Sequence, residues 1–226
     1  MIVAKALLRG FIPAVCARDP KAIMPRQDIV RMLDEHKVPW KESWGIPPAR
    51  TFEAFCEYHQ RDRFYFRNGN SHNGNGNGNG FVDKLIIDVH AAIVIVIHRY
   101  RRAWLELYED RQEFPDGSTL RRANFNGIAE TLKRIETIPR GARRCLKEEL
   151  GFRNPSKYEL SDCLHVEHRE PVPSEKWPGI WAAYHRNVFE CTISRNLFRS
   201  DGYVEREGDR TIYFKWRPRR QLQFAI

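Results

Sequence analysis

The most constraining feature of the chain is a nearly unbroken apolar run from Leu85 to Ile97, with the sequence LIIDVHAAIVIVI. Most of its residues are β-branched, and a run of this kind is typical of a strand that is buried on both faces. Residues 99–102 are expected to form a turn. Trp104–Tyr108 then alternates like the antiparallel partner in a hairpin. The run therefore predicts a sheet in which one strand is covered from both sides.

The segments after this hairpin predict more strands and a single central helix. Pro115–Gly117 predicts a turn, and a helix is expected from about Pro139 to Leu150. Three later segments predict strands, Tyr158–Val166, Ile180–Ile193 and Thr211–Trp216. Strands, a helix and then more strands favour an α/β (α+β) sandwich, a mixed sheet flanked by helices.

The residues before the apolar run predict a small helical module over residues 25–67. Asp28 is expected to start its first helix, and Thr51 to cap a second one. Residues 37–48, broken by proline and glycine, predict a loop between the helices, and residues 63–66 predict a short strand. The side chains expected to turn inward are Ile29, Val30, Met32, Leu33, Phe52, Phe55, Cys56 and Tyr58.

We therefore expect four regions along the chain. They are an N-terminal extension (1–24), the helical module (25–67), a flexible Asn/Gly-rich loop (68–80) and the main domain (81–226). The Asn-Gly repeats of the loop bury no apolar area, so backbone entropy is expected to keep it mobile. The first 18 residues carry three basic and no acidic residues. We interpret them as an ordinary extension, with a mitochondrial presequence or a poor secretory signal as the alternatives.

Composition limits the classes of function. The chain has 226 residues, of which 42% are hydrophobic and 30% charged, a balance typical of a soluble globular protein rather than a disordered or membrane one. Its formal charge of +9 favours anionic ligands. The basic residues lie in small clusters, Arg99–Arg102 and Arg217–Arg220 among them, which we interpret as mostly solvated surface. Nucleic-acid binding is therefore a minor alternative, and no membrane span is expected because the N-terminal apolar stretches are interrupted.

The cysteines bear on the compartment. Five cysteines lie far apart without a Cys-x-x-Cys pair, which argues against a disulfide scaffold or a structural zinc site. This usage suits a reducing compartment. We expect a cytoplasmic protein, with a mitochondrial location as the alternative, and the sequence does not determine the oligomeric state.

The segment from Glu136 to Phe152 carries the chemistry. Thr137 is expected to cap its helix, with Pro139 in the first turn, where a missing N–H costs little. Gly151 is placed where helices commonly end in a left-handed conformation. Three small or apolar residues recur every four positions and predict a buried stripe, Ala142, Leu146 and Leu150.

Two adjacent carboxylates, Glu148 and Glu149, stand at the C-terminal end of this helix. The helix dipole disfavours negative charge there, so the pair is poorly placed for stability alone. A hard divalent cation such as Mg²⁺ would offset the repulsion and bridge to phosphate oxygens. Cys145 lies three and four residues earlier and is expected to project toward the same region, while Arg144 is expected to pair with Glu148 one turn on. The alternative is an ordinary solvent-facing helix terminus.

The spacing of this segment resembles the Nudix box. In that pattern a Gly is followed after five residues by Glu and, seven residues later, by Arg-Glu-apolar-x-Glu-Glu-x-Gly-apolar. The positions in register are Glu136, Arg144, Leu146, Glu148, Glu149, Gly151 and Phe152. Two positions depart, because Glu130 stands at the leading Gly and Cys145 at the Glu that follows the Arg.

Context extends the resemblance over roughly residues 85–222. Nudix domains place the box after a buried strand and hairpin, as residues 85–108 predict here. They often close with a strand that leads into a Trp and a segment containing Pro and Leu. Thr211–Trp216, followed by Pro218 and Leu222, is similar to that ending, although the usual helix after it is missing.

The resemblance implies a metal-dependent hydrolase of a diphosphate-linked, nucleoside diphosphate-type substrate. It implies Mg²⁺ or Mn²⁺ held by Glu148 and Glu149, with water activated at Glu149. Glu136 and Arg144 complete the implied catalytic set by orienting the helix, and basic side chains would contact the remaining phosphates. The partner is then a small molecule that contains phosphate. A further carboxylate is expected from Glu130 or from a loop, the candidates being Glu167, Glu170, Glu190, Glu205 and Glu207.

Cys145 leaves a second hypothesis open, because a thiol is a poor substitute for a carboxylate around Mg²⁺. The chain would then be a catalytically impaired Nudix-fold module that binds a nucleotide or a protein partner. The discriminating observation is whether another carboxylate lies beside Glu148 and Glu149. Two minor hypotheses are a histidine metal site at His165 and His168, and base stacking on aromatic residues, the candidates being Trp177, Trp181, Tyr184 and Trp216.

Overall fold

The structure is a computed structural model, and it describes residues 24–46, 49–61, 63–66, 84–121, 127–133, 135–208 and 210–219. The predicted N-terminal extension, except Met24, and the predicted Asn/Gly-rich loop lie outside these residues. Within the described ranges, no helix combines the length and the apolar character that crossing a membrane requires.

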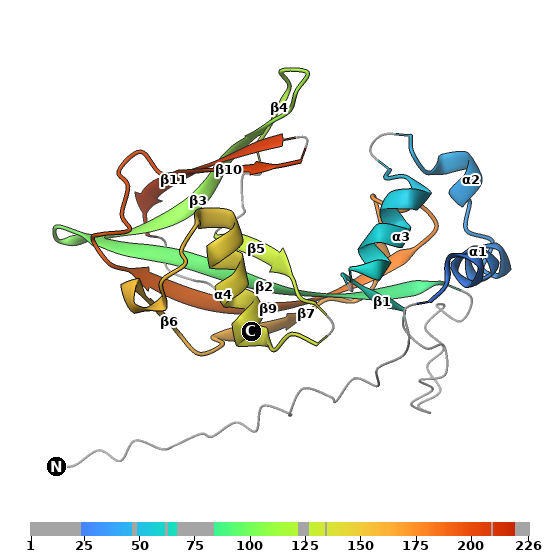
Figure 1. The fold of residues 1–226 in the computed structure, drawn as a ribbon, viewed down its shortest axis with the longest axis horizontal. Helices are drawn as coiled ribbons and strands as arrows, with labels where there is room; N and C mark the ends of the chain where they lie inside the picture. Colours follow the sequence, from blue (N-terminus) through green and yellow to red (C-terminus); the bar gives the residue numbers. More distant parts are fainter. Residues whose placement is uncertain are drawn as a thin grey trace, which may run out of the picture.

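The described elements are four α-helices, one 3-10 turn and eleven strands (Figure 1). The helices are α1 (Arg26–Glu35), α2 (Trp40–Ser43), α3 (Phe52–Gln60) and α4 (Ile138–Leu150), with the 3-10 turn η1 at Pro155–Lys157. The strands are β1 (Tyr65–Phe66), β2 (Ile86–Tyr100), β3 (Ala103–Glu113), β4 (Thr119–Leu120), β5 (Ile128–Thr131), β6 (Tyr158–Leu160), β7 (His165–His168), β8 (Val172–Pro173), β9 (Trp181–Ile193), β10 (Tyr203–Glu207) and β11 (Arg210–Pro218).

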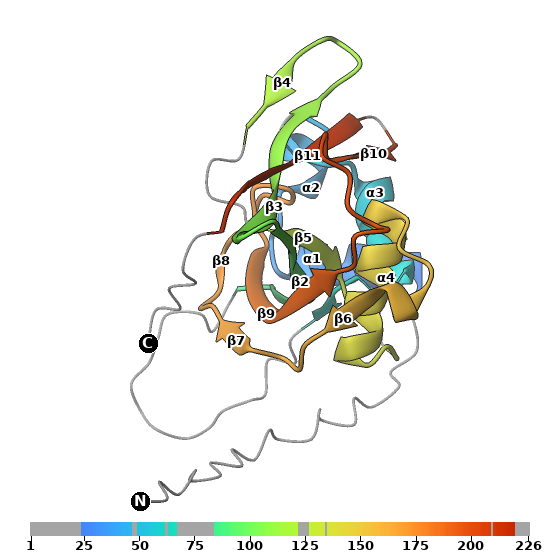
Figure 2. The same ribbon diagram turned by 90° about the vertical axis from the view of Figure 1, so that its left-hand side faces the viewer.

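The strands form one mixed sheet, whose longest path is β10-β11-β3-β2-β9-β6. Figure 2 shows that this sheet is strongly curled. Strand β2 is its axis, because β9 pairs with it in parallel along one edge from Ile86 to Ile97. Along the other edge β1, β5 and β3 take successive stretches of β2, all antiparallel. The predicted mixed sheet with flanking helices is therefore confirmed.

Strand β2 is buried on both faces, as its sequence predicts. Ala92, Val94 and Val96 belong to the main core with α4. Ile95 and Ile97 face the other way and pack with Val188 of β9. The hairpin with β3 is also confirmed, and its turn is closed by Arg101 in a left-handed conformation with φ of 53°.

Two hydrophobic cores share the strands β2 and β9. The main core lies between the sheet and α4, which packs on β2, β5 and β10. The second core encloses α1, α2 and α3 at the other end of the molecule (Figure 1). Leu85 just before β2, Ile87 in β2 and Ala182 in β9 belong to that second core. The helical module therefore packs on the same two strands that carry the main core, and the proposed domain boundaries stay a prediction.

The module follows the sequence prediction with two corrections. Thr51 caps α3 as expected, accepting a hydrogen bond from the backbone N–H of Ala54 at 3.2 Å. Asp28, however, does not start α1, which begins at Arg26 after Pro25. Asp28 lies in the first turn, where a carboxylate is favourable to the helix dipole. The predicted loop contains the short helix α2, whose Ser43 hydroxyl donates to Pro39 O at 2.6 Å.

The later strands also differ in detail. The strand predicted over Tyr158–Val166 is interrupted into β6 and β7, which both pair with β9. The strands β9 and β11 agree with their predicted segments. Strand β10 has no counterpart in the sequence prediction, because its five residues carry only a weak apolar pattern. Leu222, at the end of the segment similar to Nudix domains, lies outside the described residues.

Candidate functional site

Helix α4 has the boundaries that its sequence predicts. Proline stands in its first turn, and Gly151 ends it in the left-handed conformation with φ of 74°. The predicted stripe, Ala142, Leu146 and Leu150, is buried against the sheet. Thr137 occupies the cap position with suitable backbone angles, but its side chain makes no cap hydrogen bond. The helix is therefore fixed by its apolar face and its ends rather than by the Thr137 hydroxyl.

Arg144 is the centre of a buried hydrogen-bond network. Its Nε and Nη2 atoms donate to the two carboxylate oxygens of Glu136, each at 2.9 Å. Nη2 also donates to the carbonyl oxygen of Thr131 at 2.8 Å. The side chains of Arg144 and Glu136 are only 11% and 7% exposed. The bidentate pair joins the loop before α4 to the middle of the helix, and the Thr131 contact joins the helix to the end of β5. The network therefore fixes the loop and the helix relative to each other.

The pKa of Glu136 reflects this network. Burial by itself raises the pKa, but the hydrogen bonds from Arg144 and from the backbone N–H of Lys133 outweigh it, so the pKa lies below its ordinary value of 4.5. Glu136 is therefore a buried carboxylate anion. It does not line the cavity described below. The expectation that Glu136 and Arg144 orient and buttress the helix fits this geometry, while a catalytic role for either stays a prediction.

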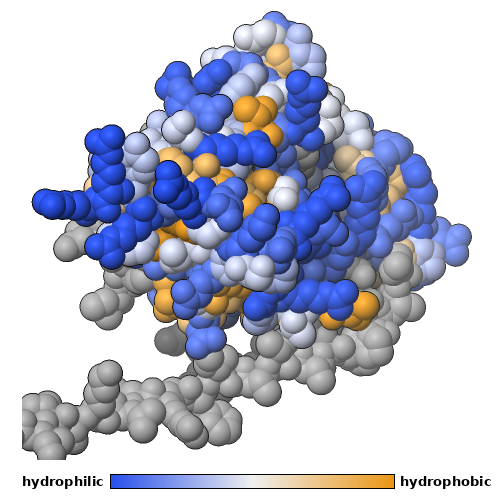
Figure 3. Space-filling view, turned by 60° about the vertical axis from the view of Figure 1, so that its left-hand side comes forward, coloured by the Kyte–Doolittle hydropathy of each residue, from blue (hydrophilic) through white to orange (hydrophobic). Residues whose placement is uncertain are grey.

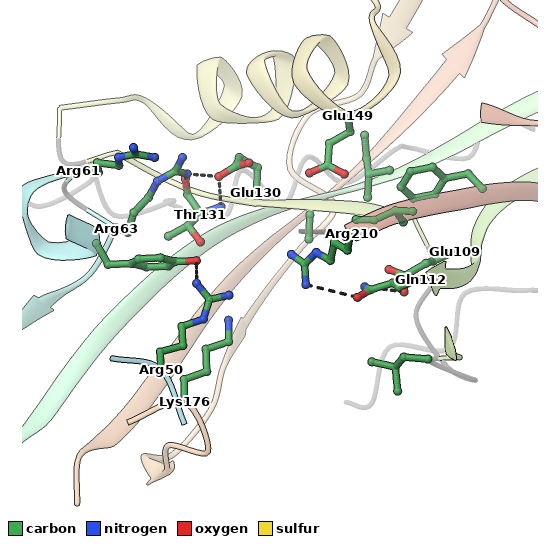
Figure 4. Close-up of a pocket in the computed structure, with 16 residues that line it drawn as sticks. Arg50, Arg61, Arg63, Glu109, Gln112, Glu130, Thr131, Glu149, Lys176 and Arg210 are labelled. Atoms are coloured by element: carbon green, nitrogen blue, oxygen red, sulfur yellow. Dashed lines mark hydrogen bonds and ion pairs between the residues drawn. The ribbon is translucent and has the colours of Figure 1, made fainter. Parts of the chain in front are cut away.

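The two adjacent carboxylates of α4 point to different places. Glu148 accepts a hydrogen bond from Arg144 Nη1 at 2.8 Å, as the sequence predicts, and its side chain is 46% exposed. Glu149 lines a cavity of about 390 Å³, and Figure 4 shows its carboxylate directed from α4 into that space. Successive residues of a helix are separated by a large rotation about its axis, so only Glu149 faces the cavity.

Glu130 brings a second carboxylate to the same cavity, from strand β5. It forms an ion pair with Arg63 and lies 3.4 Å from Arg144 Nη1. One of its oxygens also accepts from the backbone N–H of Thr131 at 3.0 Å. In Figure 4, Glu130 and Glu149 both lie on the α4 side of the cavity. A carboxylate at the box's leading Gly position thus approaches from a different direction, as the sequence suggested.

Cys145 occupies the core and does not line the cavity. It is fully buried among apolar residues of the main core. Burial, followed by the negative charges of Glu149 and Glu130, raises the pKa of its thiol well above the ordinary value. The thiol is therefore neutral, and a neutral buried thiol is neither a base nor a ligand for a hard cation. The prediction that Cys145 projects with Glu148 and Glu149 toward one region is wrong in this respect, because the apolar face of α4 includes it.

The cavity also has a cationic side, which the box does not contain. Its basic lining residues are Arg50, Arg61, Arg63, Lys176 and Arg210. Glu109 and Gln112 of β3 lie near Arg210, and the Gln112 side chain connects them (Figure 4). These residues are the candidates for the basic side chains that the sequence analysis expected in the cleft. No local pattern in the sequence could have selected them, because they come from four separate segments of the fold.

The other candidate carboxylates are distributed over the sheet. Glu167 pairs with Arg169 and Arg186, and Glu190 pairs with Arg219. Glu205 of β10 is near enough for its charge to raise the pKa of Cys145. Within the described ranges, no group of three or more His, Cys, Asp and Glu side chains is arranged to hold a metal ion. The structure therefore brings together Glu149 and Glu130, and leaves Glu167 and Glu190 in surface ion pairs.

His168 was a candidate for a histidine metal site, and Trp177 was a candidate for base stacking. His168 contacts His185, which in turn contacts Asp88 at 3.1 Å, so these residues form a chain across the strands. Trp177 is buried in the second core, where its ring lies edge-on to Phe55. Among the aromatic candidates for base stacking, Trp177 is therefore a core residue.

The basic clusters seen in the sequence serve mainly surface and structural roles. Arg99–Arg102 is exposed at the tip of the β2–β3 hairpin. Figure 3 shows charged and polar side chains over most of one face, with apolar areas between them. Arg217 pairs with the buried Glu106 at 2.7 Å, so its charge is neutralised within the sheet. Of the cluster residues that the structure describes, none lines the cavity.

No family model and no curated protein sequence matches the chain. Solved structures do match it. A C. elegans Ap4A hydrolase is 14% identical with a TM-score of 0.34, over 57% of this chain and 80% of that one. The E. coli dihydroneopterin triphosphate pyrophosphohydrolase is 16% identical with a TM-score of 0.37, over 56% and 78%. The NUDIX domain of Shewanella oneidensis NrtR, complexed with ADP ribose, is 12% identical with a TM-score of 0.30, over 58% and 73%. At these values the matches say nothing about activity or residue roles.

The spacing of the box residues in the sequence agrees with their arrangement in the structure. The Arg144–Glu136 pair closes the loop before α4, Gly151 ends the helix, and the helix packs on a curled mixed sheet beside β5. Glu149 faces a cavity that also holds Glu130. The segment thus has the spacing and the spatial arrangement of a Nudix-like box, with Cys145 in place of a glutamate.

Proposed function

We propose that the chain is a divalent-metal-dependent hydrolase of a diphosphate-linked substrate of the nucleoside diphosphate type. The observation that supports this most is the cavity, which places Glu149 and Glu130 on one side and basic residues on the other. Its volume of about 390 Å³ falls in the range of small-molecule sites. A phosphate group between the two sides would meet both a carboxylate-held cation and fixed positive charge.

The donor set fits a hard cation. Mg²⁺ and Mn²⁺ take oxygen ligands, and Mg²⁺ is commonly held by one or two carboxylates together with substrate phosphates. Glu149 would supply one of those carboxylates, and Glu130 a second one once it leaves Arg63 and Arg144. Glu148 stays a predicted ligand, and its carboxylate would first have to leave Arg144. When bound, such an ion supplies Lewis-acid stabilisation of phosphate oxygens and acidifies water.

The protein's own residues would do the rest. Glu149 directs its carboxylate into the cavity, where it can accept a proton from the attacking water. Arg144 and Glu136 hold α4 against β5, so the carboxylates keep their places. The buried thiol of Cys145 takes no part, because it is neutral and lies in the core. In this assignment, Glu149 and Glu130 together take the role in metal binding and water activation that a glutamate at position 145 would have shared.

The test is product release from a panel of nucleoside diphosphate compounds in the presence of Mg²⁺ or Mn²⁺. The wild type is expected to turn over at least one of them, and the Glu149→Gln variant to lose that turnover. Glu159→Gln is a matched control, because Glu159 is exposed on β6 outside the cavity. Circular dichroism and thermal unfolding show that each variant is folded.

Turnover by Glu149→Gln at the wild-type rate would contradict the assignment of Glu149. No turnover across a broad panel, from folded protein, would favour the alternative, a catalytically impaired module that binds its ligand. The observation behind that alternative is Cys145, which replaces a carboxylate with a buried thiol.

A further inference from the structure

The cavity has a second side that comes from outside the box. Arg50 precedes α3 in the helical module, Lys176 lies between β8 and β9, and Arg210 begins β11. In Figure 4, Arg50 and Lys176 extend toward the cavity from the side opposite Glu130 and Glu149. We call these three residues the cationic wall. Three basic side chains from separate parts of the fold therefore line one small cavity.

The contacts of Arg50 differ from those of Arg63, although both come from the module. Arg63 pairs with the Glu130 carboxylate and donates to the Thr131 carbonyl oxygen at 3.0 Å, so its charge is neutralised in place. Arg50 donates to the neutral hydroxyl of Tyr58 and lies 4.9 Å from the centre of that ring. The Tyr58 contact orients the Arg50 guanidinium without neutralising it. Arg63 is thus a positioning residue for Glu130, whereas Arg50 keeps its charge for a ligand.

The cationic wall is held in place by the protein backbone. The backbone N–H of Arg50 donates to the backbone carbonyl oxygen of Lys176 at 2.8 Å, so the two residues are joined directly. The Trp44 indole N–H donates to Pro178 O at 3.0 Å. Gly179, with φ of 88°, lies so close to the module that a Cβ there would be 2.5 Å from Pro39 Cδ. Arg50 and Lys176 are therefore preorganised for binding rather than carried on a free loop.

We propose that the helical module is part of the ligand site, and that Arg50, Lys176 and Arg210 bind an anionic group of the ligand distant from Glu149. The identification of this anionic group as phosphate rests on the proposed function. Within the proposed substrate class, one phosphate group lies on the Glu149 side of the cavity and a second anionic group at the cationic wall. Removing the module would then abolish ligand binding as well as the second core.

The test is the binding of inorganic pyrophosphate and tripolyphosphate, measured by calorimetry in EDTA so that no metal contributes. The variant Arg50→Gln/Lys176→Gln is expected to bind at least about tenfold more weakly than wild type, since charge-assisted hydrogen bonds are the strong ones. Arg26→Gln/Lys41→Gln is the matched control, because Arg26 and Lys41 are exposed in the same module and outside the cavity. It is expected to bind like wild type.

A further variant separates charge from folding. Arg50→Lys loses the planar contact with Tyr58 but keeps the positive charge, so it is expected to lose less affinity than Arg50→Gln. Equal binding by wild type and the Gln double variant would overturn the proposal, as would no binding by wild type or an equal loss in the control. Where the wild type turns over a substrate, the Gln double variant is expected to raise KM about tenfold or more, with little change in kcat. If turnover is absent while metal-free binding depends on Arg50 and Lys176, the hydrolase assignment fails and this proposal stands.

Discussion

The two sides of the cavity are built in opposite ways. On the α4 side, Glu130 forms ion pairs with Arg63 and Arg144, and Glu136 forms a bidentate ion pair with Arg144. On the cationic wall, Arg50 is held by the neutral Tyr58 hydroxyl. The first side is a stiff, charge-balanced scaffold from which Glu149 extends into the cavity. On the second side, the Tyr58 hydroxyl orients the Arg50 guanidinium without neutralising its charge. Fixing a helix and binding an anion thus require different partners for the same residue type, arginine.

The largest expected effect separates Glu149 from its neighbour. Glu149→Gln is expected to lower kcat by roughly 10²–10⁴-fold, because the carboxylate that faces the cavity is lost. Glu148→Gln is expected to have a much smaller effect, since Glu148 is half exposed and bound to Arg144. Steady-state kinetics with Mg²⁺ measures both. Equal losses in the two variants would restore the adjacent pair as the metal site and would show that Glu148 leaves Arg144 when metal binds.

The next effect concerns the scaffold. Arg144→Met would leave the Glu136 carboxylate buried without its partner, and the free energy of unfolding is expected to fall by about 3–5 kcal/mol. The double variant Glu136→Gln/Arg144→Met is expected to recover part of this loss, because no buried charge is left. Urea unfolding monitored by circular dichroism gives both values. A loss below about 1 kcal/mol in the single variant would match an exposed ion pair and would contradict the scaffold role.

A smaller effect is expected at Cys145. Cys145→Ser places a hydroxyl in an apolar core and is expected to cost about 1–3 kcal/mol of stability. The pH profile of kcat should stay unchanged, because the thiol is neutral in the wild type. Cys145→Ala is the control that removes sulfur without adding a polar group. A large loss of kcat in both variants, with stability retained, would show that the thiol takes part in the reaction.

The smallest expected effect is a pH dependence of stability at Glu136. Its pKa is lowered in the folded protein, so the carboxylate stabilises the fold above the ordinary value of 4.5 and loses this contribution as the pH falls through the folded pKa. Thermal unfolding of wild type and Glu136→Gln should therefore differ at neutral pH, and the difference should shrink in acid. A difference that stays constant down to strongly acidic pH would contradict the charged state assigned to Glu136.

The sequence predicts best what depends on neighbours along the chain. The boundaries of α4, the Arg144–Glu148 pair and the Thr51 cap all follow from spacing within one or two turns. The long strand β2 was predictable because a continuous β-branched run suits only a strand covered on both faces. These features need no knowledge of the rest of the fold.

The cationic wall could not be predicted in this way. Arg50, Lys176 and Arg210 come from three segments far apart in the sequence, and only the folded chain places them around one cavity. Cys145 shows the opposite limit. Helical spacing placed it near Glu149 correctly in distance, since the Glu149 charge acts on its thiol. It did not reveal that the residue belongs to the apolar face, which depends on how α4 rotates against the sheet.

In the proposed arrangement, one ligand spans both sides of the cavity. The most direct test is a crystal structure with Mn²⁺ and a nucleoside diphosphate whose phosphates are joined by a methylene group. Anomalous scattering should place Mn²⁺ at the Glu149 carboxylate, and a phosphate oxygen should lie within hydrogen-bond distance of Arg50 or Lys176. Mn²⁺ outside the cavity, or a ligand that contacts neither Arg50 nor Lys176, would contradict this arrangement.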